Sequence, residues 1–147
     1  MPMHVIRFGS TDDLAPEYSV ALVPTVETDA ITMIPPEKLA TSIVEPGGNT
    51  QGTLYIDLNL GSLTNVKVRF YDSYLGLPTA ADWYQEVVET DTSGVGTLDP
   101  FVVTLTASAR IAYHFPIGAT QAMKITVQGT GTQTGATLKL NAALRSN

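Results

Sequence analysis

LYIDLNLGSLTNVKVRFY, residues 54–71, contains two runs in which apolar and polar side chains alternate on either side of a turn. Apolar residues occupy every second position of each run: Leu54, Ile56, Leu58 and Leu60 in the first, and Val66, Val68 and Phe70 in the second. A period of two is what a half-buried strand requires, because successive side chains point to opposite faces of a sheet. Gly61 and Ser62, with Asn65 just beyond, supply turn chemistry between the runs. The stretch therefore predicts a central β-hairpin whose apolar face forms one wall of the core.

The same pattern continues in short segments through the rest of the chain. Further strands are predicted at 39–45 (where a short helix is the alternative), 83–89, 101–106, 110–115, 122–128 and 137–144. Residues 92–97 are expected to form a turn, and the polar stretch 129–135 a hairpin loop. No segment keeps a helical period over ten or more residues. The sequence therefore predicts an all-β fold, an antiparallel two-sheet sandwich of the jelly-roll or immunoglobulin-like type.

Residues 1–37 differ from the remainder. Their short apolar runs are separated by Pro16, Pro24, Pro35 and Pro36. Proline cannot donate a backbone hydrogen bond and favours extended conformations in the residue before it. The sequence thus predicts an extended N-terminal arm at 1–37 and a β-sandwich domain at 38–147. The alternative, to which we give equal weight, is that 18–23 forms an edge strand of the main domain.

Composition restricts the kinds of partner. The 147 residues carry a net charge of −6, and the eight Lys and Arg residues are scattered singly. Phosphate binding needs clustered basic groups, so direct nucleic-acid binding is not expected. No apolar run approaches the ~20 residues that a membrane-spanning helix needs, and the start, MPMHVIRFGSTDD, does not predict a secretion signal. Cysteine is absent, which leaves neither disulfides nor thiolate chemistry.

No set of residues predicts catalysis, a metal or a cofactor, so we expect the chain not to be an enzyme. His4 and His114 are the only histidines, and no G-x-S-x-G motif occurs. The glycine-rich stretch 129–135 leads into a strand, whereas a dinucleotide-binding loop leads into a helix. Asp82, Glu86, Glu89 and Asp91 could pair on a strand as a Ca²⁺ site or a glycosidase couple, but a solvated acidic face is the simpler interpretation.

Aromatic residues offer a separate hypothesis. Tyr71, Tyr74, Trp83 and Tyr84 are candidates for the exposed platform with which many β-sandwich modules bind carbohydrate. A single tryptophan in a sandwich more often lies in the core.

One resemblance to a known group of proteins is carried by LGSLTNVKVRFYDS (60–73) and DWYQE (82–86). At Gly61 to Phe70 and at Trp83 to Glu86 the sequence resembles small β-sandwich structural proteins of tailed bacteriophages, of the head decoration (cement) or tail accessory type. The stretch YDSYLGLPTAAD, residues 71–82, replaces the short Asp-Gly turn of those proteins.

The resemblance implies a capsid decoration protein of the virion, made in the host cytoplasm, that binds the major capsid protein or other virion proteins. It also implies a homo-oligomer, with a trimer favoured. A tail or head–tail adaptor component and a glycan-binding module are the alternatives. Apolar residues of the arm are the predicted capsid or subunit contacts: Val5, Ile6, Phe8, Val20, Leu22, Ile31 and Ile34.

Overall fold

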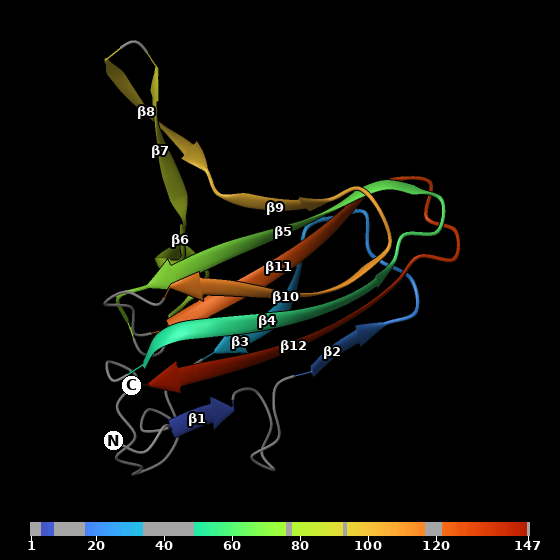
Figure 1. Ribbon diagram of the computed structural model, residues 1–147, viewed down its shortest axis with the longest axis horizontal. Helices are drawn as coiled ribbons and strands as arrows, with labels where there is room; N and C mark the ends of the chain where they lie inside the picture. Colours follow the sequence, from blue (N-terminus) through green and yellow to red (C-terminus); the bar gives the residue numbers. More distant parts are fainter. Residues whose placement is uncertain are drawn as a thin grey trace.

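The computed structural model describes residues 4–7, 17–33, 49–75, 78–92, 94–116 and 122–146, most of them in β-strands (Figure 1). The strands are β1 (His4–Arg7), β2 (Glu17–Val20), β3 (Thr28–Met33), β4 (Asn49–Asn59), β5 (Leu63–Ser73), β6 (Tyr84–Gln85), β7 (Val87–Thr92), β8 (Val95–Pro100), β9 (Val102–Leu105), β10 (Ala109–Pro116), β11 (Ala122–Gly131) and β12 (Thr137–Ser146). A short 3-10 turn, η2 (Ala80–Asp82), lies between β5 and β6. Among these residues no helix is long and apolar enough to cross a bilayer. The strand predicted at 39–45 falls outside the described residues.

Two antiparallel sheets pack against each other, which confirms the predicted all-β sandwich. Sheet A has the order β1-β12-β4-β10, and β2 pairs with the other half of β12. Sheet B has the order β3-β11-β5-β6, and β9 pairs with another part of β5. Eight of these strands form the pair of sheets β2-β12-β4-β10 and β3-β11-β5-β9. That order is the jelly roll, one of the two predicted topologies.

Four connections cross from one sheet to the other at the same end of the sandwich: β2 to β3, β4 to β5, β9 to β10 and β11 to β12 (Figure 1). The predicted central hairpin is therefore wrong, because β4 lies in sheet A and β5 in sheet B. The hairpin predicted at 129–135 is wrong for the same reason. Alternation shows which side chains are buried, but it does not distinguish strands paired within a sheet from strands facing each other across a core.

Gly61 lies where two of these crossing connections touch. Its φ of +56° is in the left-handed region, and a Cβ there would be 2.4 Å from the carbonyl oxygen of Thr134. The neighbouring Ser62 backbone N–H donates to that same oxygen at 3.1 Å. On the other side, the Leu60 N–H donates to Oγ of Ser108 at 2.9 Å. The crossing connections are thus hydrogen-bonded to one another.

The core fills the space between the sheets as the alternation predicts. Each central strand contributes alternate side chains that are at most 3% exposed: Leu54, Ile56 and Leu58 of β4; Val66, Val68 and Phe70 of β5; Met123, Ile125 and Val127 of β11; Leu138, Leu140 and Ala142 of β12. The Phe70 ring lies 5.2–5.8 Å from those of Phe101, Tyr113 and Phe115. These rings are tilted, an arrangement that aromatic pairs favour.

Residues 17–33 belong to the sandwich. β2 pairs with β12 and β3 with β11, so both lie at sheet edges, as in the edge-strand alternative. Val23 and Ile31 are buried in the core. β1 also pairs with β12. Of the predicted arm, residues 1–3, 8–16 and 34–37 lie outside the described residues.

We expect Gly61→Ala to destabilise the protein by about 3 kcal/mol or more. A left-handed alanine costs roughly 1–2 kcal/mol, and the new methyl group must also displace the backbone of the adjacent connection. Gly135→Ala is the matched control, because Gly135 has a similar φ of +66° but nothing within 4 Å of its would-be Cβ. Urea denaturation measures both. Equal losses in the two variants would contradict the packing argument.

Candidate functional site

Exposed apolar side chains gather in one part of the described chain. Seven of the eleven large exposed hydrophobic residues lie between 74 and 98: Tyr74, Leu75, Tyr84, Val87, Val88, Val95 and Leu98. Four of these belong to β7 and β8, which pair only with each other and project away from the sandwich (Figure 1). Concentrated exposed apolar surface is a mark of an interaction site. We refer to β7 and β8 as the projecting hairpin.

Threonines and a tight link hold the projecting hairpin together. Thr92 pairs with Val95, so two residues connect the strands, and the second, Gly94, has a φ of +78°. The Thr90 hydroxyl donates to Oδ2 of Asp99 at 2.6 Å and lies 2.9 Å from the hydroxyl of Thr97. These contacts cross-link the strands on one face.

The projecting hairpin has features that suit it to binding a partner. Every residue of β8 is exposed, and the described side chains of β7 are exposed too. A lone two-stranded hairpin is only marginally stable in water, and its outer backbone edges are available for pairing. Residues 87–100 contain three acidic and no basic residues. The complementary surface would be apolar with basic groups at its rim.

A carboxyl pair lies where the projecting hairpin joins the sandwich. The Glu86 N–H donates to the Phe70 carbonyl at 2.9 Å, and the Phe101 N–H donates to the Glu86 carbonyl at 2.8 Å. Burial, followed by a hydrogen bond to Asp72 and repulsion from it, raises the pKa of Glu86 to about 8. Burial also raises the pKa of Asp72. The two carboxyl groups therefore share a proton at neutral pH.

The acidic residues singled out from the sequence are distributed differently from the predicted pairs. Glu86 is paired with Asp72, whereas Asp82 accepts hydrogen bonds at 2.7 Å from both the N–H and the hydroxyl of Thr79. Glu89 and Asp91 lie on β7. No group of three or more His, Cys, Asp or Glu residues suited to a metal ion occurs in the described part of the chain. His114 is hydrogen-bonded to Thr53 at 2.9 Å.

The aromatic residues proposed as a glycan platform separate into two groups. Tyr71 and Trp83 both contact Lys124, whose Nζ is 5.2 Å and 5.0 Å from their ring centroids. A cation therefore already lies over both rings. Tyr74 and Tyr84 form an exposed pair with ring centroids 6.0 Å apart.

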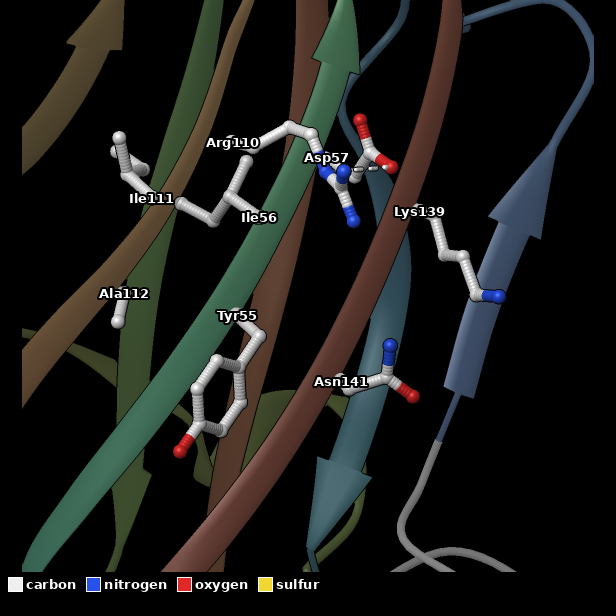
Figure 2. A pocket seen from close by; sticks show the side chains of 8 residues that line it. All are labelled: Tyr55, Ile56, Asp57, Arg110, Ile111, Ala112, Lys139 and Asn141. Carbon is white, nitrogen blue, oxygen red and sulfur yellow. Dashed lines mark ion pairs between the residues drawn. The ribbon is translucent and has the colours of Figure 1, made fainter.

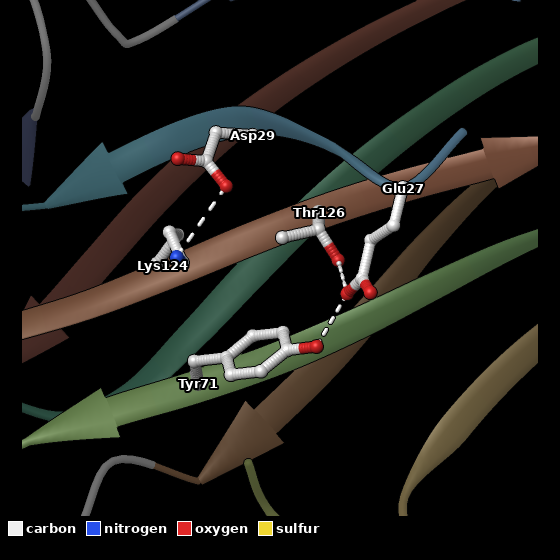
Figure 3. A network of polar contacts seen from close by, with 5 residues as sticks. All are labelled: Glu27, Asp29, Tyr71, Lys124 and Thr126. Carbon is white, nitrogen blue, oxygen red and sulfur yellow. Dashed lines mark hydrogen bonds and ion pairs between the residues drawn. The ribbon is translucent and has the colours of Figure 1, made fainter. Parts of the chain in front are cut away.

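Polar contacts extend this arrangement over the outer face of sheet B (Figure 3). Lys124 forms an ion pair with Asp29 at 3.4 Å. Glu27 accepts hydrogen bonds from the hydroxyls of Tyr71 and Thr126, the latter at 2.7 Å. Burial and the contact with Glu27 raise the pKa of Tyr71 to about 12. Burial alone would raise the pKa of the Glu27 carboxyl group, but the hydrogen bonds from Tyr71 and Thr126 act against this effect, and the pKa is lowered. Side chains on the outer face of sheet B therefore contact one another through hydrogen bonds, an ion pair and a cation–π contact.

The predicted N-terminal contact residues lie in different environments. Leu22 is 53% exposed, Val20 is half-buried against the core, and Ile31 is a core residue at 3% exposure. Val5 and Ile6 belong to β1, which pairs with β12. Phe8 and Ile34 fall outside the described residues. A contact at Leu22 stays a prediction, whereas the burial of Ile31 is accounted for within its own chain.

Sequence reasoning missed the projecting hairpin and the Asp72–Glu86 pair. Residues 92–97, expected as a turn, are the tip of the hairpin and its flanking residues, and the predicted strand 83–89 is divided at Glu86 into β6 and β7. The available signal was the β-branched content on both sides of Ser93 and Gly94. The carboxyl pair had no signal, because Asp72 lies on β5 and Glu86 lies between β6 and β7, fourteen positions further along the chain.

We expect stability to fall as the pH rises through about 8, and Glu86→Gln to remove most of this dependence. The folded-state pKa of Glu86 is raised above its usual 4.5. The stabilising contribution of the protonated group is therefore complete below pH 4.5 and lost as Glu86 ionises. Thermal unfolding of both proteins between pH 5 and 9 measures the effect. Glu89→Gln, on the exposed hairpin, is the control. An unchanged slope in Glu86→Gln would refute the assignment.

Comparison with protein-family models, with curated proteins and with solved structures finds no match to this chain.

Proposed function

We propose that this chain is a structural protein of a tailed-bacteriophage virion, a capsid decoration protein that binds the head lattice through its projecting hairpin. The observation that carries the proposal is an acidic hairpin with exposed apolar side chains attached to a jelly-roll body. The resemblance to small phage structural proteins supports it. Its two stretches contribute to neighbouring strands, since Tyr71 of β5 pairs with Gln85 of β6.

The jelly-roll core does not depend on the side chains of the projecting hairpin. Of the described residues between 84 and 100, none belongs to the buried core cluster. Exposed valine and leucine side chains contribute little to folding, but each can contribute about 1.5–3 kcal/mol when fully buried at a contact. This division suits a protein whose body folds alone and whose hairpin becomes ordered against a partner.

Repeated contacts on a capsid lattice can compensate for the small area that one hairpin buries. A stable interface usually buries about 800 Å² on each partner, which is more than one short hairpin offers. A homo-oligomer, for which we favour a trimer, would present several hairpins to repeated copies of the major capsid protein, and linked weak contacts give strong overall binding. The acidic hairpin is unsuited to nucleic acid, and the partner that we propose is protein.

A tail or head–tail adaptor component would use the same surface, and labelling the protein within virions distinguishes the two locations. For a glycan-binding module, the platform at Tyr71 and Trp83 is the least favourable place, because Lys124 occupies it. Removing residues 1–37 is a poor test of the arm, since it also removes Val23 and Ile31 from the core.

Leu98→Asp should weaken binding to heads of the parent phage at least tenfold. Leu98 is 70% exposed, and loss of its burial at a contact exceeds the 1.4 kcal/mol that corresponds to a tenfold change. Co-sedimentation of the full chain with undecorated heads measures the affinity, and light scattering reports the oligomeric state in parallel.

The matched control is Val26→Asp, which places the same charge on a side chain that is 73% exposed in the β2–β3 connection. It should bind as the unaltered protein does. Full binding by Leu98→Asp would remove the hairpin from the proposed interface, and absence of binding by the unaltered protein would overturn the decoration function itself.

A further inference from the structure

A groove of about 460 Å³ crosses the outer face of sheet A (Figure 2). It lies on β4, β10 and β12, whereas the projecting hairpin is attached at β6 and β9 of sheet B. The residues that line it are Tyr55, Ile56, Asp57, Arg110, Ile111, Ala112, Lys139 and Asn141. Its volume falls within the ~300–1,000 Å³ of small-molecule sites. None of these residues belongs to the hairpin or to the network around Lys124.

Strand register arranges the groove as two rows across the sheet. In one row Asp57 of β4 stands between Arg110 of β10 and Lys139 of β12. In the next row Tyr55 stands between Ala112 and Asn141. A small alanine beside the tyrosine leaves open space along the ring, which is 52% exposed. The groove thus combines an aromatic surface at Tyr55 with a row of charged groups at Asp57, two residues further along β4.

The groove carries charged groups of both signs, with Arg110 and Lys139 on either side of Asp57. Nε of Arg110 lies 3.5 Å from Oδ2 of Asp57, and the arginine side chain is 86% exposed. This exposed ion pair is made through Nε of Arg110. An exposed guanidinium can bind a carboxylate through two parallel hydrogen bonds.

We infer that this groove binds a saccharide that carries a carboxylate, such as a hexuronate unit of an acidic polysaccharide. The apolar C–H face of a pyranose ring packs on the exposed Tyr55 ring. Its carboxylate pairs with Arg110, and the amide of Asn141 hydrogen-bonds to the ring hydroxyls. This binding site goes beyond the proposed decoration function and does not depend on it. A decoration protein facing outward from a head would present such a groove to bacterial surface polysaccharide.

Titration calorimetry on the full chain tests this inference with trigalacturonate and with maltotriose, a neutral trisaccharide. We expect the acidic ligand to bind at least tenfold more tightly than the neutral one. Arg110→Gln should abolish that preference, and Tyr55→Ala should weaken binding of trigalacturonate tenfold or more. Both residues are exposed, so the variants should keep the unfolding temperature of the unaltered protein.

Two further variants make the test specific. Ala112→Phe should block binding by filling the groove. Tyr74→Ala removes an exposed tyrosine that follows β5 of the other sheet, and it should change nothing. Sialyllactose, tested in the same way, distinguishes an animal sialic acid from a uronate as the source of the carboxylate, and binding of either that is lost in Arg110→Gln supports the site. Absence of binding by any acidic saccharide at millimolar concentration, or binding unaffected by Arg110→Gln and Tyr55→Ala, would overturn the inference.

Discussion

Contact between the chain crossings at one end of the sandwich is the constraint on which the rest of the fold depends. The connection at Gly61 and Ser62 is hydrogen-bonded to the one at Thr134. The β11–β12 connection, which contains Thr134, is hydrogen-bonded in turn to the β2–β3 connection, since the Val23 N–H donates to the Ala136 carbonyl at 3.0 Å. Stacked crossings of this kind fix the order of strands in both sheets at once, because each strand must leave its crossing beside the same neighbour.

The two outer faces of the sandwich differ although the sheets share one strand order. On sheet B, Lys124 joins β11 to Tyr71 of β5 and to Asp29 of β3, so side chains cover the strands. On sheet A the small Ala112 leaves a groove beside Tyr55. Binding features therefore lie on separate elements, the groove on sheet A and the hairpin at the edge of sheet B. Because no core residue is shared between them, a change at one site should leave the other intact.

Local pattern predicted more of the fold than of the candidate site. The alternation at 54–58, 66–70, 123–127 and 138–142 identified strands and their buried faces, because burial of one face leaves a period-two trace in the sequence. It did not predict pairing, since Gly61 suits a hairpin turn and a crossing between sheets equally well. The meeting of Asp72 with Glu86, and of Tyr71 and Trp83 with Lys124, depends on which strands become neighbours. No single segment records that information.

Glu86 connects the stability of the body to the placement of the hairpin. Its backbone is bonded to Phe70 on one side and to Phe101 on the other, so both ends of the insertion are tied to β5 and the aromatic core through one residue. Its side chain shares a proton with Asp72 at the same point. A hairpin without core contacts of its own takes its orientation from such an attachment. This half-buried carboxyl pair therefore lies where the projecting hairpin is attached, and a change in its charge would act on the attachment of the exposed apolar strands.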